Sequence, residues 1–187
     1  MGLDMYLQKR HYVGNKWRKD KKQQVKVTVP KVQKEATFPT KQIKQERVQY
    51  ITEEVAYWRK ANAIHQWFVE NVQDGDDDCG EYEVSREQLE ELLTTVNKVL
   101  KASKLVKGKI QNGSKSTAKG WEPIMEDGKY IEDPATAQEL LPTTEGFFFG
   151  GKDYDQYYYE DLTYTQETLT ALLAEDDHYD FLYYASW

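Results

Sequence analysis

The sequence predicts an α+β fold, in which one domain contains a small, mostly antiparallel sheet packed by about three helices. Segments near both ends of the chain have the hydrophobic patterns of strands, and internal segments repeat hydrophobic residues every three or four positions, as amphipathic helices do. Hydrophobic residues make up 39% of the 187-residue chain, so the chain can bury one core. The mean hydropathy of −0.84 indicates that long segments stay in water.

Strands are predicted at both termini and at several internal positions. Residues 2–12 alternate hydrophobic and polar side chains, which is the period of a half-buried strand. Residues 180–187 are rich in aromatic and large aliphatic side chains, which favours a terminal strand. The three phenylalanines at 147–149 predict a short buried strand. Residues 121–131 contain Asp127 and Gly128, a dipeptide typical of hairpin turns.

Three helices are predicted. Residues 52–72 carry hydrophobic side chains at spacings of four and three, namely Tyr57, Ala61, Ile64, Phe68 and Val72. Residues 85–100 open with a capping box made by Ser85 and Gln88 and then place leucine and valine residues on one side. Residues 153–174 form the third candidate, with a stripe of leucines.

Charge is distributed unevenly along the chain. Residues 1–60 carry 15 Lys and Arg against 6 Asp and Glu, residues 61–120 carry 8 against 10, and residues 121–187 carry 2 against 16. Residues 14–48 are interpreted as a basic excursion with a short edge strand before Pro30. Residues 101–120 are rich in Lys, Ser and Gly and are expected to form an exposed loop or a flexible insertion.

The acidic stretch 74–85, DGDDDCGEYEVS, resembles a metal-binding loop at first sight. A calcium loop that starts at Asp74 has Cys79 where the sharp turn requires glycine, and a loop that starts at Asp76 has Glu81 there. Both registers fail, so we expect a polar connector. The acids disfavour a reactive thiolate on Cys79. Zinc ligation by His65, Cys79, Glu81 and His178 is chemically permissible, but no ligand spacing singles it out. No metal, cofactor or catalytic residue is therefore predicted.

Three surfaces are candidate binding sites. Acids and tyrosines are mixed in one segment and favour a protein-binding surface or a nucleic-acid mimic; these residues are Asp153, Tyr154, Asp155, Tyr157, Tyr158, Glu160 and Asp161. A second group lies on roughly one side of the predicted helix 52–72 and, with Tyr82, could bind a nucleotide or an acidic partner; it consists of Trp58, Arg59, Asn62 and His65. A third group could bind nucleic acid and consists of Lys16, Arg18, Lys19, Lys21 and Lys22.

Several segments resemble a family of small uncharacterised proteins encoded by bacteriophages and prophages. They are MGLDMYL, YWRKANAIHQWF, DDCGEYEVS, EGFFFGGKDYDQYYYEDL and YYASW. The resemblance covers the core segments over most of the chain, whereas residues 14–48 and 101–134 look like variable parts. It implies a phage accessory protein that acts in the bacterial cytoplasm. It carries over no activity and no site residue.

The first functional hypothesis is a stoichiometric inhibitor of a host defence effector, similar to an anti-CRISPR protein, whose acidic surface partly mimics nucleic acid. The partner would be a host protein or ribonucleoprotein complex. The first alternative is a nucleotide-binding protein, either a sequestering sponge or a small enzyme. The second alternative is a nucleic-acid binder that uses the basic excursion. No membrane association is expected, because the sequence has neither an apolar segment of membrane-spanning length nor the apolar region of a signal peptide.

Overall fold

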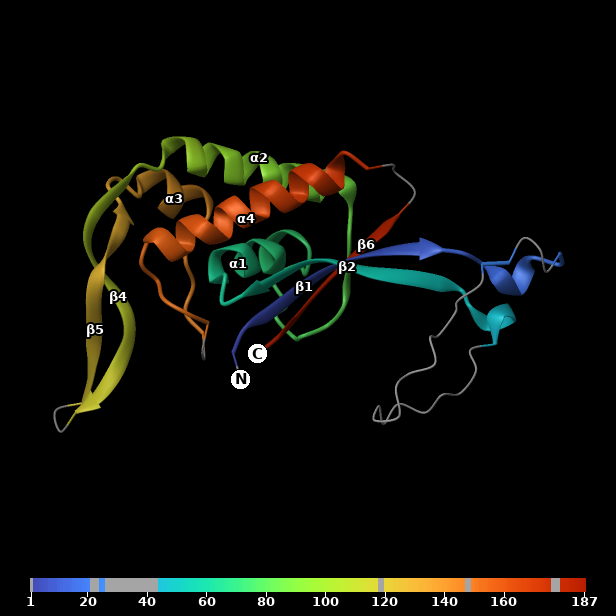
Figure 1. Cartoon of the computed structure of the whole chain (residues 1–187), viewed down its shortest axis with the longest axis horizontal. Coiled ribbons are helices and arrows are strands. Elements are labelled where there is room, and N and C mark those ends of the chain that lie inside the picture. Colours follow the sequence, from blue (N-terminus) through green and yellow to red (C-terminus); the bar gives the residue numbers. More distant parts are fainter. Residues whose placement is uncertain (1, 21–23, 26–43, 118–119, 147–148, 176–178) are drawn as a thin grey trace, which may run out of the picture.

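A four-stranded antiparallel sheet forms one layer of the protein, and helices cover one of its faces (Figure 1). The computed structural model describes residues 2–20, 24–25, 44–117, 120–146, 149–175 and 179–187. The strand order is β2-β1-β6-β3, with bounds Tyr50–Arg59, Asp4–Tyr12, Asp180–Ser186 and Tyr82–Val84. The predicted α+β fold in a single domain is confirmed.

The two terminal strands are neighbours at the centre of this sheet. β1 pairs with β6 from Asp4 opposite Ser186 to Arg10 opposite Asp180. The predicted alternation at the N-terminus is confirmed, because Leu3, Met5 and Leu7 are completely buried. The predicted terminal strands are thus both present, and each satisfies the backbone hydrogen bonds of the other.

The core lies between the sheet and the helices α1 (Asn62–Asn71), α2 (Arg86–Ala102) and α4 (Gln156–Leu173). α2 and α4 lie side by side, and the short helix α3 (Ala135–Leu140) contacts α2 (Figure 1). Phe68 of α1 stacks on Tyr183 of β6 with ring centroids 3.9 Å apart. Such a buried aromatic pair stabilises the contact between helix and sheet beyond the area that it buries.

The helices that were predicted from capping and leucine stripes are confirmed. The Ser85 side chain accepts a hydrogen bond from Gln88 N, and the Gln88 side chain accepts one from Ser85 N, so the capping box of α2 is complete. Asp155 caps α4 by accepting hydrogen bonds from the backbone N–H groups of Tyr157 and Tyr158. Both caps satisfy donors that a helix leaves unpaired at its first turn.

The predicted helix over residues 52–72 is wrong in its first half. Residues 50–59 form β2, which pairs with β1, and the helix begins only at Asn62. Lys60 separates the two elements with a φ of 62°, a conformation that ends a strand. The spacing of four between Tyr57 and Ala61 therefore joins a strand residue to the residue that precedes a helix. The β-branched and aromatic residues of 50–58 were the signal for a strand.

The predicted loop or flexible insertion over residues 101–120 is also wrong, because most of it is the strand β4 (Leu105–Thr117). β4 pairs with β5 (Gly120–Ile131) in a long two-stranded hairpin. Asp127 and Gly128, predicted as a turn, lie inside β5, and the register of the two strands extends to Thr117 opposite Gly120. An ion pair of 2.8 Å between Lys109 and Asp127 joins the strands.

Two predicted strands lie partly outside the described residues. The parts outside are residues 26–29 of the edge strand predicted before Pro30, and two of the three phenylalanines at 147–149. Phe149 is buried but is not in a strand.

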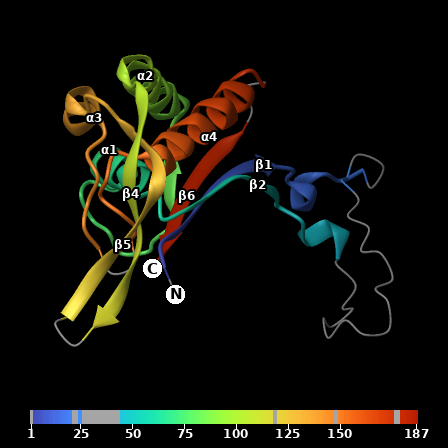
Figure 2. The same cartoon turned by 60° about the vertical axis from the view of Figure 1, so that its left-hand side comes forward.

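An arm continues β1 and β2 beyond the body, on a different side from the β4–β5 hairpin (Figure 2). Its described part includes two short 3-10 helices, η1 (Asn15–Trp17) and η3 (Gln45–Arg47). The arm corresponds to the predicted basic excursion. No helix among the described residues is long and apolar enough to cross a membrane.

Candidate ligand-binding pocket

A pocket of about 880 Å³ lies where the end of β2, the start of α1, the middle of β4, the loop before α4 and the first turns of α4 meet. This volume falls within the range of small-molecule sites in proteins. The lining includes residues from two of the surfaces that the sequence predicted separately. These are Arg59 and Asn62 from the second group, and Asp153, Asp155, Tyr157, Tyr158, Glu160 and Asp161 from the first.

The corner between β2 and α1 fixes one wall. Lys60 N donates a hydrogen bond of 2.8 Å to Leu3 O, and Lys60 O accepts one of 2.9 Å from Asn62 N. Gly150 passes so close that a Cβ atom on it would lie 3.0 Å from Lys60 O, and its φ is 99°. Glycine therefore allows the loop before α4 to approach this corner.

Asn62 holds that loop in place. Its side-chain nitrogen donates to Phe149 O at 3.1 Å and to Gly151 O at 2.8 Å, and its side-chain oxygen accepts from Thr144 N at 3.1 Å. The residue is 4% exposed. Asn62 thus builds the pocket wall, and these bonds occupy both atoms of its side-chain amide.

Most polar groups on the α4 wall have partners within the protein. The Asp155 carboxylate caps the helix, and burial raises its pKa although the two N–H groups that it accepts from lower it. The Tyr158 hydroxyl donates to Leu141 O at 2.9 Å, and burial raises its pKa. The Tyr157 hydroxyl donates to Glu126 Oε1 at 3.0 Å, which raises the pKa of Tyr157.

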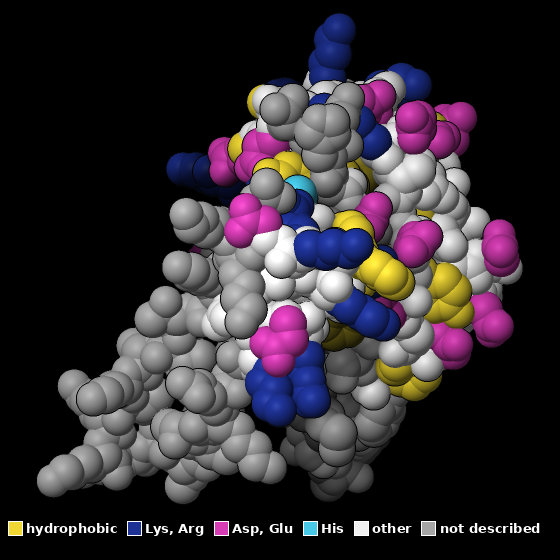
Figure 3. Space-filling view, turned by 90° about the vertical axis from the view of Figure 1, so that its right-hand side faces the viewer, with side chains coloured by type: hydrophobic (Ala, Val, Ile, Leu, Met, Phe, Trp, Pro, Cys, Tyr) yellow, Lys and Arg dark blue, Asp and Glu magenta, His cyan; other side chains and the backbone are white. Residues whose placement is uncertain are grey.

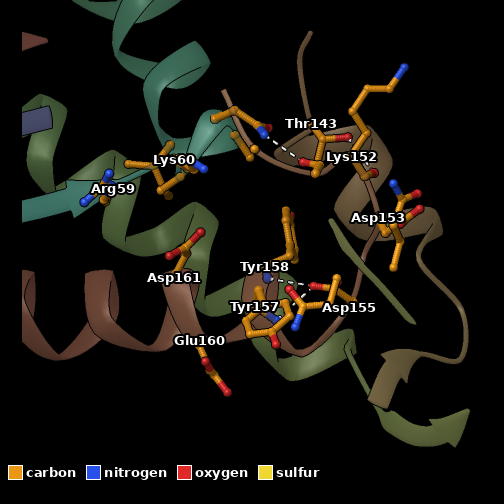
Figure 4. Close-up of a pocket in the computed structure, with 18 of the residues that line it drawn as sticks. Arg59, Lys60, Thr143, Lys152, Asp153, Asp155, Tyr157, Tyr158, Glu160 and Asp161 are labelled. Atoms are coloured by element: carbon orange, nitrogen blue, oxygen red, sulfur yellow. Dashed lines mark hydrogen bonds between the residues drawn. The ribbon is translucent and has the colours of Figure 1, made fainter. Parts of the chain in front are cut away.

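Asp161 differs from its neighbours on this wall. Its carboxyl group points into the space bounded by Arg59, Lys60 and Tyr158 (Figure 4). Burial, with smaller contributions from the charges of Glu160 and Asp155, raises its pKa to about 7. Within the described ranges, no side chain donates a hydrogen bond to this carboxyl group or forms an ion pair with it. A partly buried carboxyl group without a partner is costly unless a ligand or proton satisfies it.

Two cationic residues at the end of β2, Arg59 and Lys60, line the same pocket as Asp161. Arg59 has a side chain that is 63% exposed, and its one ion pair with a described residue is a long contact of 3.9 Å from Nε to Asp4. Lys60 is exposed, and its Nζ atom has no hydrogen bond or ion pair with any residue in the described part of the chain. The nearby Lys152 pairs with Glu145 instead, and its amino group extends away from the pocket in Figure 4.

The remaining members of the second predicted group do not reach the pocket. Trp58 and Arg59 lie on a strand, so the predicted shared helix face does not exist. Trp58 Nε1 donates to Thr165 Oγ1 at 2.9 Å inside the core. His65 is 1% exposed. Its Nδ1 atom lies 2.7 Å from the Tyr183 hydroxyl, and its Nε2 atom lies 3.0 Å from the Asp77 carboxylate.

The acidic stretch 74–85 has structural contacts. Asp77 accepts a hydrogen bond from Trp187 Nε1 at 3.0 Å in addition to its contact with His65. Asp78 accepts from Gly80 N and from the hydroxyl of Tyr82, at 2.7 and 3.1 Å. Across the described ranges, no group of three or more potential metal ligands was found. The stretch contains the short strand β3 and the cap of α2, so it connects two helices as the predicted polar connector would.

The other predicted site residues lie as follows. Asp153 and Glu160 are exposed, and Tyr154 packs edge-to-face on Tyr158 with ring centroids 5.0 Å apart. Lys16, Arg18 and Lys19 are exposed on the arm, whereas Lys21 and Lys22 lie outside the described residues.

Sequence reasoning missed Lys60, the glycines 150–151 and the β4 residues 111–114. The paired glycines and the Asn-Gly dipeptide at 112–113 indicate unusual backbone, but neither indicates a pocket. Comparison with known proteins found no matching protein-family model, no matching curated protein and no matching solved structure.

Proposed function

We propose that the protein binds a small anionic ligand that also carries hydrogen-bond donors, of which nucleotides are the representative class, in the pocket between β2 and α4. The observation that carries this proposal is the Asp161 carboxyl group, which points into a pocket that Arg59 and Lys60 also line and has no partner of its own among the described residues. A phosphate group suits the two cations, and ribose hydroxyls or base amino groups suit the carboxylate.

The charge arrangement favours a ligand with two different ends. An anion alone would satisfy Arg59 and Lys60 but would be repelled by Asp161 once this residue is ionised. A cation alone would be attracted by the ionised Asp161 but repelled by Arg59 and Lys60. The wall is already shaped, because Asn62 and Asp155 are held by hydrogen bonds within the protein. Little ordering of the wall is therefore required when a ligand binds.

The inhibitor hypothesis stays a prediction. Asp155 and Tyr158 are buried, so an acidic surface that mimics nucleic acid would depend on the exposed Asp153 and Glu160. In the phage context that the resemblance implies, nucleotide binding would act by sequestering a host nucleotide. The pocket therefore supports the sponge form of the nucleotide hypothesis more directly than the mimic.

The test is a thermal-shift and calorimetric titration of the full chain with nucleoside mono- and triphosphates, inorganic phosphate and unphosphorylated nucleosides. A ligand that binds only the folded protein raises Tm by mass action. We expect Arg59→Ala and Asp161→Asn each to weaken binding by about ten-fold or more, because each removes a charged hydrogen-bonding partner.

The matched controls change charge away from the pocket. Glu167→Gln removes an exposed acid from α4, and Lys98→Ala removes an exposed cation from α2; neither residue lines the pocket. Both should bind as the wild type does. The proposal fails if no compound changes Tm, or if binding survives unchanged in both pocket variants.

A further inference from the structure

The arm carries exposed aromatic side chains. Trp17 is 71% exposed, more than any other large hydrophobic side chain described, and Tyr12 and Tyr50 are 48% and 47% exposed. Tyr12 and Tyr50 face each other across the last pair of β1 and β2, with ring centroids 5.1 Å apart. Large aromatic side chains that are exposed together on a protruding element are typical of a binding surface.

Cations lie against these rings. The Lys16 amino group is 5.1 Å from the centroid of the Trp17 ring, and the Arg10 guanidinium carbon is 4.7 Å from that of Tyr50. Arg18 and Lys19 follow Trp17 in an exposed stretch. Lys and Arg side chains lie beside hydrophobic ones at this end of the molecule in Figure 3, with acidic side chains also in view.

A buried asparagine holds the described part of the arm in shape. Asn15 is fully buried, and its side chain donates to Val25 O and to Gln45 O, both at 2.8 Å, and accepts from Val25 N at 2.9 Å. Val13 N also donates to Gln49 O at 2.8 Å. These bonds join the outgoing and returning chains, so Trp17 is presented on an ordered base.

Residues 14–48 carry 11 Lys and Arg against 3 Asp and Glu, a net charge of +8, whereas the rest of the chain carries 14 against 29, a net charge of −15. A polyanion is therefore attracted by the arm and repelled by the body. The projection of the arm reduces that conflict, because charges separated by more than a Debye length of about 8–10 Å are largely screened at physiological salt.

We propose that the arm binds single-stranded nucleic acid, with one base stacked on Trp17 and phosphates held by Lys16, Arg18 and Lys19. Exposed aromatic rings combined with cations match this ligand, because the bases of a single strand offer free faces and its backbone offers regular negative charge. A duplex offers the charge but covers its base faces. The arm and the nucleotide-class pocket are separate surfaces, so each proposal can fail alone.

The experiment measures fluorescence anisotropy of labelled single-stranded oligonucleotides with the full chain over a range of salt concentrations. Trp17→Ala should weaken binding by about ten-fold with little change in salt dependence, because stacking is lost and the phosphate contacts remain. Lys16→Ala combined with Lys19→Ala should lower the slope of log affinity against log salt by about 1.4, at about 0.7 for each phosphate contact. Met125→Ala, which truncates an exposed side chain on the other hairpin, is the control and should bind normally.

Two competitors decide whether the ligand is a nucleic acid. A duplex of the same sequence should bind at least about ten-fold more weakly than the single strand, because its bases are not free to stack. Poly-glutamate tests for an acidic protein partner. Two results would overturn the proposal. One is that poly-glutamate binds as tightly as the oligonucleotide and that the Trp17→Ala variant binds both polymers as the wild type does. The other is that the oligonucleotide does not bind at all.

Discussion

Asp161 lowers the stability of the folded protein at neutral and alkaline pH. Its pKa is raised to about 7 in the fold, mainly by burial, whereas an unfolded aspartate titrates near 3.9. Below about pH 4 the group is protonated in both states and the cost is absent. As pH rises toward 7 the unfolded state releases its proton first, so stability falls, and above 7 the whole cost is present.

Asp161→Asn should therefore stabilise the free protein, and more at pH 8 than at pH 5. We expect an increase of about 1–3 kcal/mol in the free energy of unfolding at pH 8, given about 1.4 kcal/mol for each pKa unit and a site that is only partly buried. Urea unfolding at the two pH values measures this. Equal effects at both values, or a loss of stability at pH 8, would contradict it. A substitution that stabilises the protein while weakening binding is the pattern expected at a functional residue.

His65 illustrates why residue type alone does not identify a site. On the sequence it lies beside Asn62 on an apolar helix, and both look available to a ligand. In the structure His65 joins Tyr183 of β6 to Asp77 of the acidic stretch, and Asp77 also holds Trp187. Removing one of these side chains would leave buried polar atoms unpaired, so the role of these residues is to stabilise the fold.

At the scale of elements, segments with one buried face could be predicted and the others could not. β1, α2 and α4 each bury alternate or helically spaced residues, and this pattern appears directly in the sequence. β4 buries only Ile110 at its centre, and its cross-strand ion pairs involve residues that look like a loop. The pattern of β2 resembles that of a helix because its last residues lead into the helical stripe of α1.

The pocket could be predicted only in parts. The sequence singled out Arg59 and Asn62 for one reason, and the acids and tyrosines of α4 for another. Their meeting depends on how β2 and α4 pack, and no spacing along the chain records that contact. Lys60 gave no signal at all, because one lysine at the end of a basic segment looks like a solvated charge.

Asp155, at the start of α4, connects the pocket, the helix and the β4–β5 hairpin, so its replacement should affect the stability of the fold. It caps α4, and its backbone forms a β-bridge with Tyr130 of β5. Asp155→Ala should lower the free energy of unfolding by about 1–2 kcal/mol, since two N–H groups lose their acceptor. Asp155→Ser keeps a capping oxygen and should recover most of that loss. Denaturant unfolding of both variants tests this, and an equal loss in both would show that capping is not the cause.

The whole molecule is divided into an acidic body and a basic arm. Replacing residues 14–48 by an Asn-Gly turn is geometrically reasonable, because Val13 and Gln49 are already hydrogen-bonded next to the last strand pair. The hydrophobic core contains no described residue of that segment, so the body should still fold. The net charge, however, changes from −7 to −15, since the segment carries +8.

The shortened protein should therefore depend more on salt than the full chain. Self-repulsion among uncompensated acids destabilises the compact state, and salt screens it. Raising the salt concentration from about 0.02 M to about 0.5 M should increase Tm more in the shortened protein than in the full chain. Thermal unfolding of both proteins at each concentration measures the difference. Equal salt dependence would mean that the arm does not offset the charge of the body, and its basic character would then have to be explained by an external partner alone.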